Sequence, residues 1–157
     1  INMSLSYFLL GRYNEALTCI NKIVNVRSDY RMDEQAAAKM FVLIIHYELR
    51  NLDLLPYISK ASERWLIKNN YPLRSFDKAL ISFFKNKLPK MDSIKEEQKE
   101  LSQMLAHLKQ DINPSHSIIR EEGVDNISWL ESKIHNRPFI DVVREKRFNL
   151  TRVNAKG

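Results

Sequence analysis

The sequence predicts an all-α protein, and three observations lead to that prediction. Apolar residues recur at steps of three and four along almost the whole chain, which is the spacing of one face of an α-helix. Only three glycines and five prolines occur in 157 residues, too few for the frequent turns of a β-sandwich or barrel. Polar or proline-containing breaks divide the periodic stretches into about eight helices.

The first four predicted helices are separated by short polar breaks. A short helix at the start of the chain ends near Gly11, and a second covers residues 13–26. A third begins at Asp33, whose side chain is a favourable N-cap. A fourth follows a polar turn and ends before Pro72, because proline cannot continue a helix.

The second half of the chain is predicted to contain four more helices. Residues 75–87 form the fifth and residues 92–110 the sixth. Residues 112–124 read as a linker. Two short helices within 125–148 would then cap the fold, the first capped by Asp125 and the second with Pro138 in its first turn, and 149–157 would be a frayed tail.

The run from Gly11 to Leu17 resembles the tetratricopeptide repeat at the turn between its two helices. In that motif a glycine (Gly11) ends the first helix, an aromatic residue (Tyr13) fills the turn, and a small residue (Ala16) lets the second helix approach closely. The resemblance implies antiparallel helix pairs stacked as a short right-handed α-α superhelix. A non-repeating helical bundle is the alternative that the apolar spacing leaves open.

A second, altered copy of the turn begins about 39 residues later, against the ~34 residues usual for this repeat. Here Arg50 stands in place of the glycine, Leu52 in place of the tyrosine and Leu55 in place of the alanine. Without a glycine we expect the turn to close differently, and we expect Leu55 to widen the helix spacing. Residues 75–111 keep only the outline of a helix pair. The predicted pairs are therefore 1–26, 33–69 and 75–111.

The resemblance also implies a non-catalytic scaffold that binds a peptide or partner protein in a groove formed by the first helices of the pairs. An acidic or amphipathic peptide would suit the mixed apolar and charged lining. The predicted groove residues are Met40, Ile44, Tyr47, Glu48, Phe83, Asn86 and Lys87.

No constellation of catalytic residues is apparent, and we expect no cofactor and no metal site. The four histidines include no pair at the i, i+4 spacing that places two metal ligands on one helix face, and Cys19 is the only cysteine. The one mixed acid–base run, from His46 to Glu48, lies among core-facing residues, which favours a packed histidine over a catalytic one. The isolated glycines provide no phosphate-binding loop.

The net charge of +6 and the sequence pI near 9.4 raise nucleic acid as an alternative partner. Positive residues are concentrated at the end of the fifth predicted helix and near the C-terminus, namely Lys85, Lys87, Lys90, Arg144, Lys146, Arg147 and Arg152. An ordinary charged surface is the favoured explanation, because the C-terminal end of a helix attracts cations through its dipole. A third possibility is a regulatory piece of an enzyme whose active domain lies upstream.

The longest apolar runs are far shorter than the ~20 residues of a membrane-spanning helix, so we expect no membrane partner. The single cysteine is consistent with the reducing cytoplasm. The chain starts with Ile1 within a helical pattern, which suggests a fragment of a longer protein. A first helix truncated in this way could expose an apolar edge and permit self-association.

Overall fold

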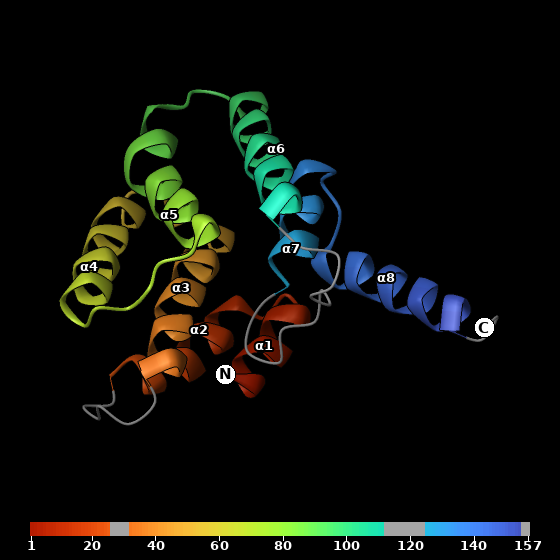
Figure 1. Ribbon diagram of the computed structural model, residues 1–157, viewed down its shortest axis with the longest axis horizontal. Coiled ribbons are helices and arrows are strands. Elements are labelled where there is room, and N and C mark those ends of the chain that lie inside the picture. The colour runs from red at the N-terminus through yellow and green to blue at the C-terminus, as the bar shows by residue number, and fades with distance from the viewer. Residues whose placement is uncertain (26–31, 112–124, 155–157) are drawn as a thin grey trace.

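The computed structural model describes residues 1–25, 32–111 and 125–154 (Figure 1). Within these residues all regular structure is helical and no β-strand occurs, which confirms the all-α prediction and the expected number of helices. The predicted linker at 112–124 lies outside the described residues.

The part of the chain that the structure describes contains eight α-helices. They are α1 (Asn2–Leu9), α2 (Tyr13–Val24), α3 (Met32–Glu48), α4 (Leu55–Lys68), α5 (Ser75–Ser82), α6 (Ile94–Asp111), α7 (Asn126–Ile134) and α8 (Phe139–Asn154). The rod that begins as α5 continues as a π-helical turn, η1 (Phe83–Lys87), and a 3₁₀ turn, η2 (Leu88–Lys90).

Each helix packs against the next helix along the chain. Helix α3 lies between α2 and α4, and α4 occupies one edge of the molecule in Figure 1. The first helices of successive pairs also meet through aromatic side chains, because Phe8 of α1 lies with its ring centroid 5.1 Å from that of Phe41 in α3. Nearest-neighbour packing of this kind is what stacked helix pairs require, and a bundle of short-looped helices shares it.

The turn at Gly11 ends α1 as the sequence predicts. Gly11 has a φ of 72°, in the left-handed region that glycine adopts without steric cost. Its amide donates to the carbonyl of Phe8 at 3.0 Å, and the next amide, of Arg12, donates to the carbonyl of Tyr7 at 2.9 Å. These two bonds define a Schellman motif, which satisfies carbonyls at the helix end.

The same turn recurs at Arg50, which has a φ of 57°. The amide of Arg50 donates to the carbonyl of Tyr47, and that of Asn51 donates to the carbonyl of His46, each at 3.0 Å. Arg50 therefore occupies the structural place of Gly11, as the altered copy of the repeat predicts. The expectation that a turn without glycine closes differently is wrong, because the same pair of bonds forms at both turns. Asn70 and Asn136 end α4 and α7 with the same pair of bonds and a positive φ.

The fifth helix departs from its predicted form. Instead of stopping at residue 87, the rod changes to a π turn in which the amide of Leu88 donates to the carbonyl of Phe83, five residues back. A π turn accommodates one extra residue, which shifts the faces that the following side chains present. Phe83, Phe84 and Leu88 are all buried.

Three predicted boundaries are tested by the described residues. Asp125 caps α7, since its carboxylate accepts from the amide of Ser128 at 3.1 Å, as predicted. Asp33 is not the N-cap of α3 but lies in its first turn, because the helix begins at Met32. The predicted tail is helical as far as Asn154, where α8 ends.

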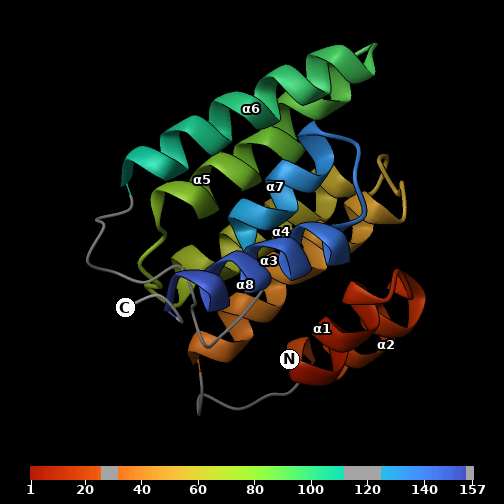
Figure 2. The same ribbon diagram turned by 90° about the vertical axis from the view of Figure 1, so that its right-hand side faces the viewer.

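The last two helices fold back onto the first two pairs, with α7 and α8 in front of α3 in Figure 2. The ring of Trp129 in α7 meets Tyr47 of α3 edge-on, with centroids 5.7 Å apart. The ring of Phe139 at the start of α8 lies 5.5 Å from that of Phe8 in α1. Helices α7 and α8 thus contribute aromatic side chains to the central core.

Candidate functional site

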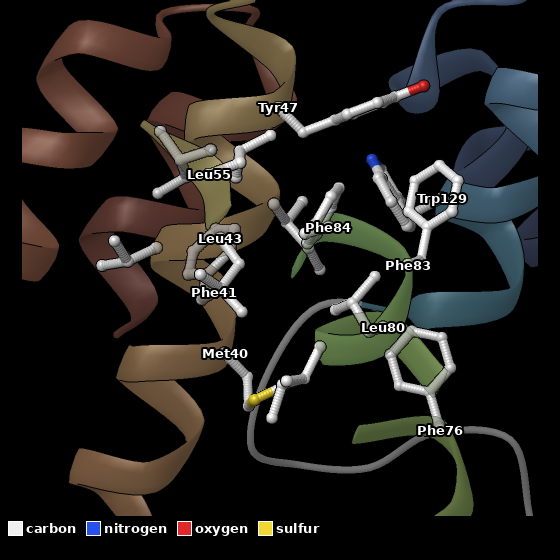
Figure 3. Packing of buried hydrophobic residues seen from close by; sticks show 14 of the residues in the cluster. Met40, Phe41, Leu43, Tyr47, Leu55, Phe76, Leu80, Phe83, Phe84 and Trp129 are labelled. Atoms are coloured by element: carbon white, nitrogen blue, oxygen red, sulfur yellow. The ribbon is translucent and has the colours of Figure 1, made fainter. Parts of the chain in front are cut away.

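Most of the predicted groove residues lie in the core and do not line an open surface. The exposed fractions are 7% for Met40, 2% for Ile44, 5% for Tyr47 and 1% for Phe83. All four belong to one hydrophobic cluster, part of which is drawn in Figure 3. Side chains buried in this way cannot contact a peptide on the surface, so the structure corrects their predicted exposure.

Helix α7 explains much of this correction. Trp129 is completely buried and lies beside Tyr47 and Phe83 in Figure 3. At its C-terminal end, the face of α3 that the repeat register assigns to a groove is therefore covered by η1 and α7 of the same chain, because Phe84 also packs on Tyr47, with ring centroids 5.5 Å apart. A local register places a residue on a helix face, but it does not reveal which later segment packs there.

Glu48, the fifth groove residue, joins three helices at the C-terminal end of α3. One carboxylate oxygen accepts from the indole Nε1 of Trp129 at 2.7 Å, and the other accepts from Lys133 Nζ at 2.7 Å. Tyr13 of α2 lies close to the same side chain. The carboxylate is only 7% exposed, and its two charge-assisted hydrogen bonds hold α7 against α3.

Glu97 of α6 is a second buried carboxylate, and it lies next to the turn that follows α3. It accepts from Arg50 at 3.2 Å and lies close to Tyr47. Arg50 also lies with its guanidinium carbon 5.7 Å from the centre of the Tyr47 ring. The arginine at the altered repeat turn therefore connects that turn to α6, a contact that a glycine could not make.

The tyrosines and the histidine of this region have shifted pKa values. Burial, followed by the negative charge of Glu48, raises the pKa of Tyr13 from 10.0 to about 12. Burial likewise raises the pKa of Tyr47, and Glu97 adds to the effect. Burial lowers the pKa of His46, whose Nδ1 lies 3.1 Å from the side-chain nitrogen Nδ2 of Asn51. The histidine is packed and hydrogen-bonded within the fold.

The two remaining groove residues, Asn86 and Lys87, are exposed at the π turn. Lys87 Nζ forms an ion pair with Glu100 at 2.6 Å, and Asn86 Nδ2 lies 3.5 Å from the hydroxyl of Ser82. The structure thus does not bring these two residues together with the other five on one surface.

The repeat-turn residues form the contacts between the paired helices. Tyr13 packs on Phe8 with ring centroids 5.2 Å apart, and Ala16 is completely buried. The hydroxyl of Ser4 donates to the carbonyl of Ala16 at 2.7 Å, a close approach that the small side chain permits. In the second copy Leu55 is also completely buried, and Leu52 is partly buried.

The basic concentrations noted in the sequence are largely engaged in ion pairs. Lys85 pairs with Glu63 at 2.6 Å and Lys146 with Glu131 at 2.8 Å. Arg144 lies 4.0 Å from Asp141. Internal carboxylates therefore reduce the positive charge that these residues could offer to phosphate groups.

One side of α4 is an exposed surface that was not predicted from the sequence. Helix α4 buries one stripe, consisting of Leu55, Ser59, Ser62 and Leu66. Its opposite side, which we call the α4 outer face, is exposed and consists of Leu54, Tyr57, Lys60, Ala61, Arg64, Ile67 and Lys68. The spacing of Lys60, Arg64 and Lys68 at four-residue steps was the signal available in the sequence.

Three apolar side chains make the α4 outer face unusual for a helix at the edge of the molecule. The exposed fractions are 76% for Tyr57, 62% for Ile67 and 50% for Leu54. Isolated exposed apolar residues are common, but a group of them on one helix face is typical of an interaction surface.

Comparison with known proteins gives no relative: no protein-family model, no curated protein and no solved structure matches the chain. Within residues 1–25, 32–111 and 125–154, no three histidine, cysteine, aspartate or glutamate side chains gather closely enough to hold a metal ion. None of the helices described there combines the length and the apolar character that crossing a membrane requires.

Proposed function

We propose that this chain is a non-catalytic module that binds a partner protein, with its helix pairs stacked in the manner of tetratricopeptide repeats. The observation that carries the proposal is the α4 outer face, which holds three of the seven large apolar side chains that are exposed among the described residues. Burying such side chains against a partner removes apolar area from water, which is the main driving force of protein association.

The buried carboxylates support a structural role and not a catalytic one. The side chains of Glu48 and Glu97 are only 7% and 8% exposed, and both carboxylates already accept hydrogen bonds from the same chain. A general base needs a free lone pair directed at a substrate. The polar groups of this region instead fasten α2, α3, α6 and α7 to one another.

A site-specific cross-linking experiment tests the proposal. A photo-reactive amino acid at Ala61, within the α4 outer face, is expected to capture a discrete partner protein, whereas the same probe at the exposed Ser102 of α6 is not. The partner would be identified by mass spectrometry, purified and titrated against the chain. The double substitution Tyr57→Ala and Ile67→Ala should weaken its binding by about tenfold or more.

Two results would contradict the proposal. One is the absence of any cross-link specific to the Ala61 position. The other is a captured protein whose purified form binds the wild-type chain and the double variant with equal affinity.

A further inference from the structure

We propose that the α4 outer face binds an acidic amphipathic helix of its partner, through a cationic stripe flanked by apolar side chains. This inference rests on the proposed protein-binding function and names the chemistry of the partner. It follows from the spacing, the charge and the composition of the face.

The spacing of the face suits a second helix. Tyr57 and Arg64, Lys60 and Ile67, and Ala61 and Lys68 are three pairs separated by seven residues. Positions seven apart lie on nearly the same side of a helix, so the six residues form one stripe about 16 Å long at a rise of ~1.5 Å per residue. A partner helix lying along α4 could contact the stripe over its whole length.

The charge of the stripe is positive and is not neutralised within the described residues. Lys60, Arg64 and Lys68 form no ion pair there, in contrast to Lys85, Lys87, Lys109, Lys133 and Lys146, each of which pairs with a glutamate. The only acidic residue of α4, Glu63, points to Lys85 at 2.6 Å and leaves the outer face uncompensated. Asp53, exposed just before the helix, is the nearest negative charge along the chain.

The positive charge of the stripe therefore favours an acidic partner. The three cations stand four residues apart, about 6 Å along the helix axis. Glutamates or aspartates at four-residue steps on a facing helix would meet them one to one. Such pairs contribute modestly to affinity but set the register and exclude basic partners.

The apolar residues distinguish an acidic helix from a nucleic acid. Ile67 and Ala61 offer nothing to a phosphate backbone, and Tyr57 is the only aromatic ring on the face, where binding of single strands uses several stacking platforms. On a helical partner, leucines beside the acidic residues would cover Tyr57 and Ile67. The small Ala61 would allow the two helix backbones to approach closely.

The test uses the full chain and two fluorescent peptides, measured by anisotropy. One peptide is a designed amphipathic helix with glutamates at three successive i, i+4 positions and leucines between them. The other has the same composition in scrambled order. We expect the ordered peptide to bind in the micromolar range, at least about tenfold more tightly than the scrambled one, and less tightly as salt is raised.

Charge reversal supplies the decisive variants. Lys60→Glu, Arg64→Glu and Lys68→Glu together should weaken binding of the glutamate peptide by about ten- to a hundredfold. A peptide with lysines at the three positions should bind this triple variant and not the wild type. The matched control reverses three exposed lysines elsewhere, Lys90, Lys95 and Lys99, and should leave binding of the glutamate peptide nearly unchanged.

Several outcomes would overturn the inference. These are no binding of the ordered peptide, equal binding of the scrambled peptide, or equal losses in the triple variant and its control. Another contrary result is a single-stranded oligonucleotide that binds the wild-type chain more tightly than the peptide and fails to bind the triple variant. That result would identify nucleic acid as the ligand. A captured partner that depends on Tyr57 and Ile67 but not on the three cations would overturn this inference alone and leave the proposed function standing.

Discussion

Helices α3 and α4 form one hairpin, yet α3 is largely buried and α4 is exposed along one side. Helix α3 packs between α2 and α4, and η1 and α7 cover its C-terminal end, so that nine of its residues are buried. Helix α4 lies at the edge, buries a single stripe and leaves the opposite stripe to solvent. The resemblance places the binding surface on α3. The packing buries that side of α3 and leaves the α4 outer face exposed.

The difference shows that a sequence-derived helix face becomes a surface only if no later segment covers it. Trp129 lies 82 positions after Tyr47 in the chain, and the two rings nevertheless form an edge-to-face contact. The substitutions below test the two sides of this comparison, and their expected effects decrease from the first to the last.

Removing Trp129 should have the largest effect. Trp129→Ala leaves a cavity beside Tyr47 and Phe83 and removes one of the hydrogen bonds to Glu48. We expect the free energy of unfolding, measured by urea denaturation, to fall by about 3–5 kcal/mol. Trp129→Phe, which keeps much of the volume but not the indole N–H, should lose less. A loss below about 1 kcal/mol for the alanine variant would mean that α7 does not cover α3 in solution.

Glu48→Gln should have the next largest effect. The substitution keeps an acceptor for Trp129 Nε1 but removes the charge that pairs with Lys133, whose side chain is only 22% exposed. We expect a loss of about 2 kcal/mol in the same denaturation experiment.

The matched control is Glu145→Gln, which breaks the pair between Arg137 and Glu145 on the surface of α8. Both of those side chains are about half exposed, and solvent screens the pair, so the expected loss is below about 0.5 kcal/mol. Equal losses in the two variants would show that Glu48 does not fasten α7 to α3.

Alkaline pH should weaken the same region through Tyr13. The pKa of Tyr13 is about 12 in the folded chain against 10.0 as its ordinary value, so the unfolded chain releases this proton first. The contribution to stability is complete below pH 10 and is lost as the pH rises towards 12. Tyr13→Phe cannot ionise and should lose less of its stability across that interval, as followed by urea denaturation at each pH. Parallel curves for the two proteins would contradict this expectation.

The sequence predicted the helices well because their periodicity and capping are local properties. Asp125 could be identified as an N-cap, and Arg50 could be placed at the turn position of Gly11, from the neighbouring residues alone. The π turn at Phe83 was missed because two adjacent buried phenylalanines also fit a regular helix. The network at Glu48 joins residues of α2, α3 and α7, and no local pattern reports contacts across that separation.

The smallest effect on stability is expected on the α4 outer face, and it tests the other half of the comparison. Tyr57→Ala and Ile67→Ala together should change the free energy of unfolding by less than about 0.5 kcal/mol, because alanine favours the helix and the removed side chains are mostly exposed. The control on the same helix, Leu66→Ala, removes a completely buried side chain and should cost about 2–5 kcal/mol. If the double variant lost more than about 1.5 kcal/mol, Tyr57 and Ile67 would be packing residues of the fold itself. The contrast between an enclosed α3 and an open α4 would then fail, and the interaction surface proposed on α4 would fail with it.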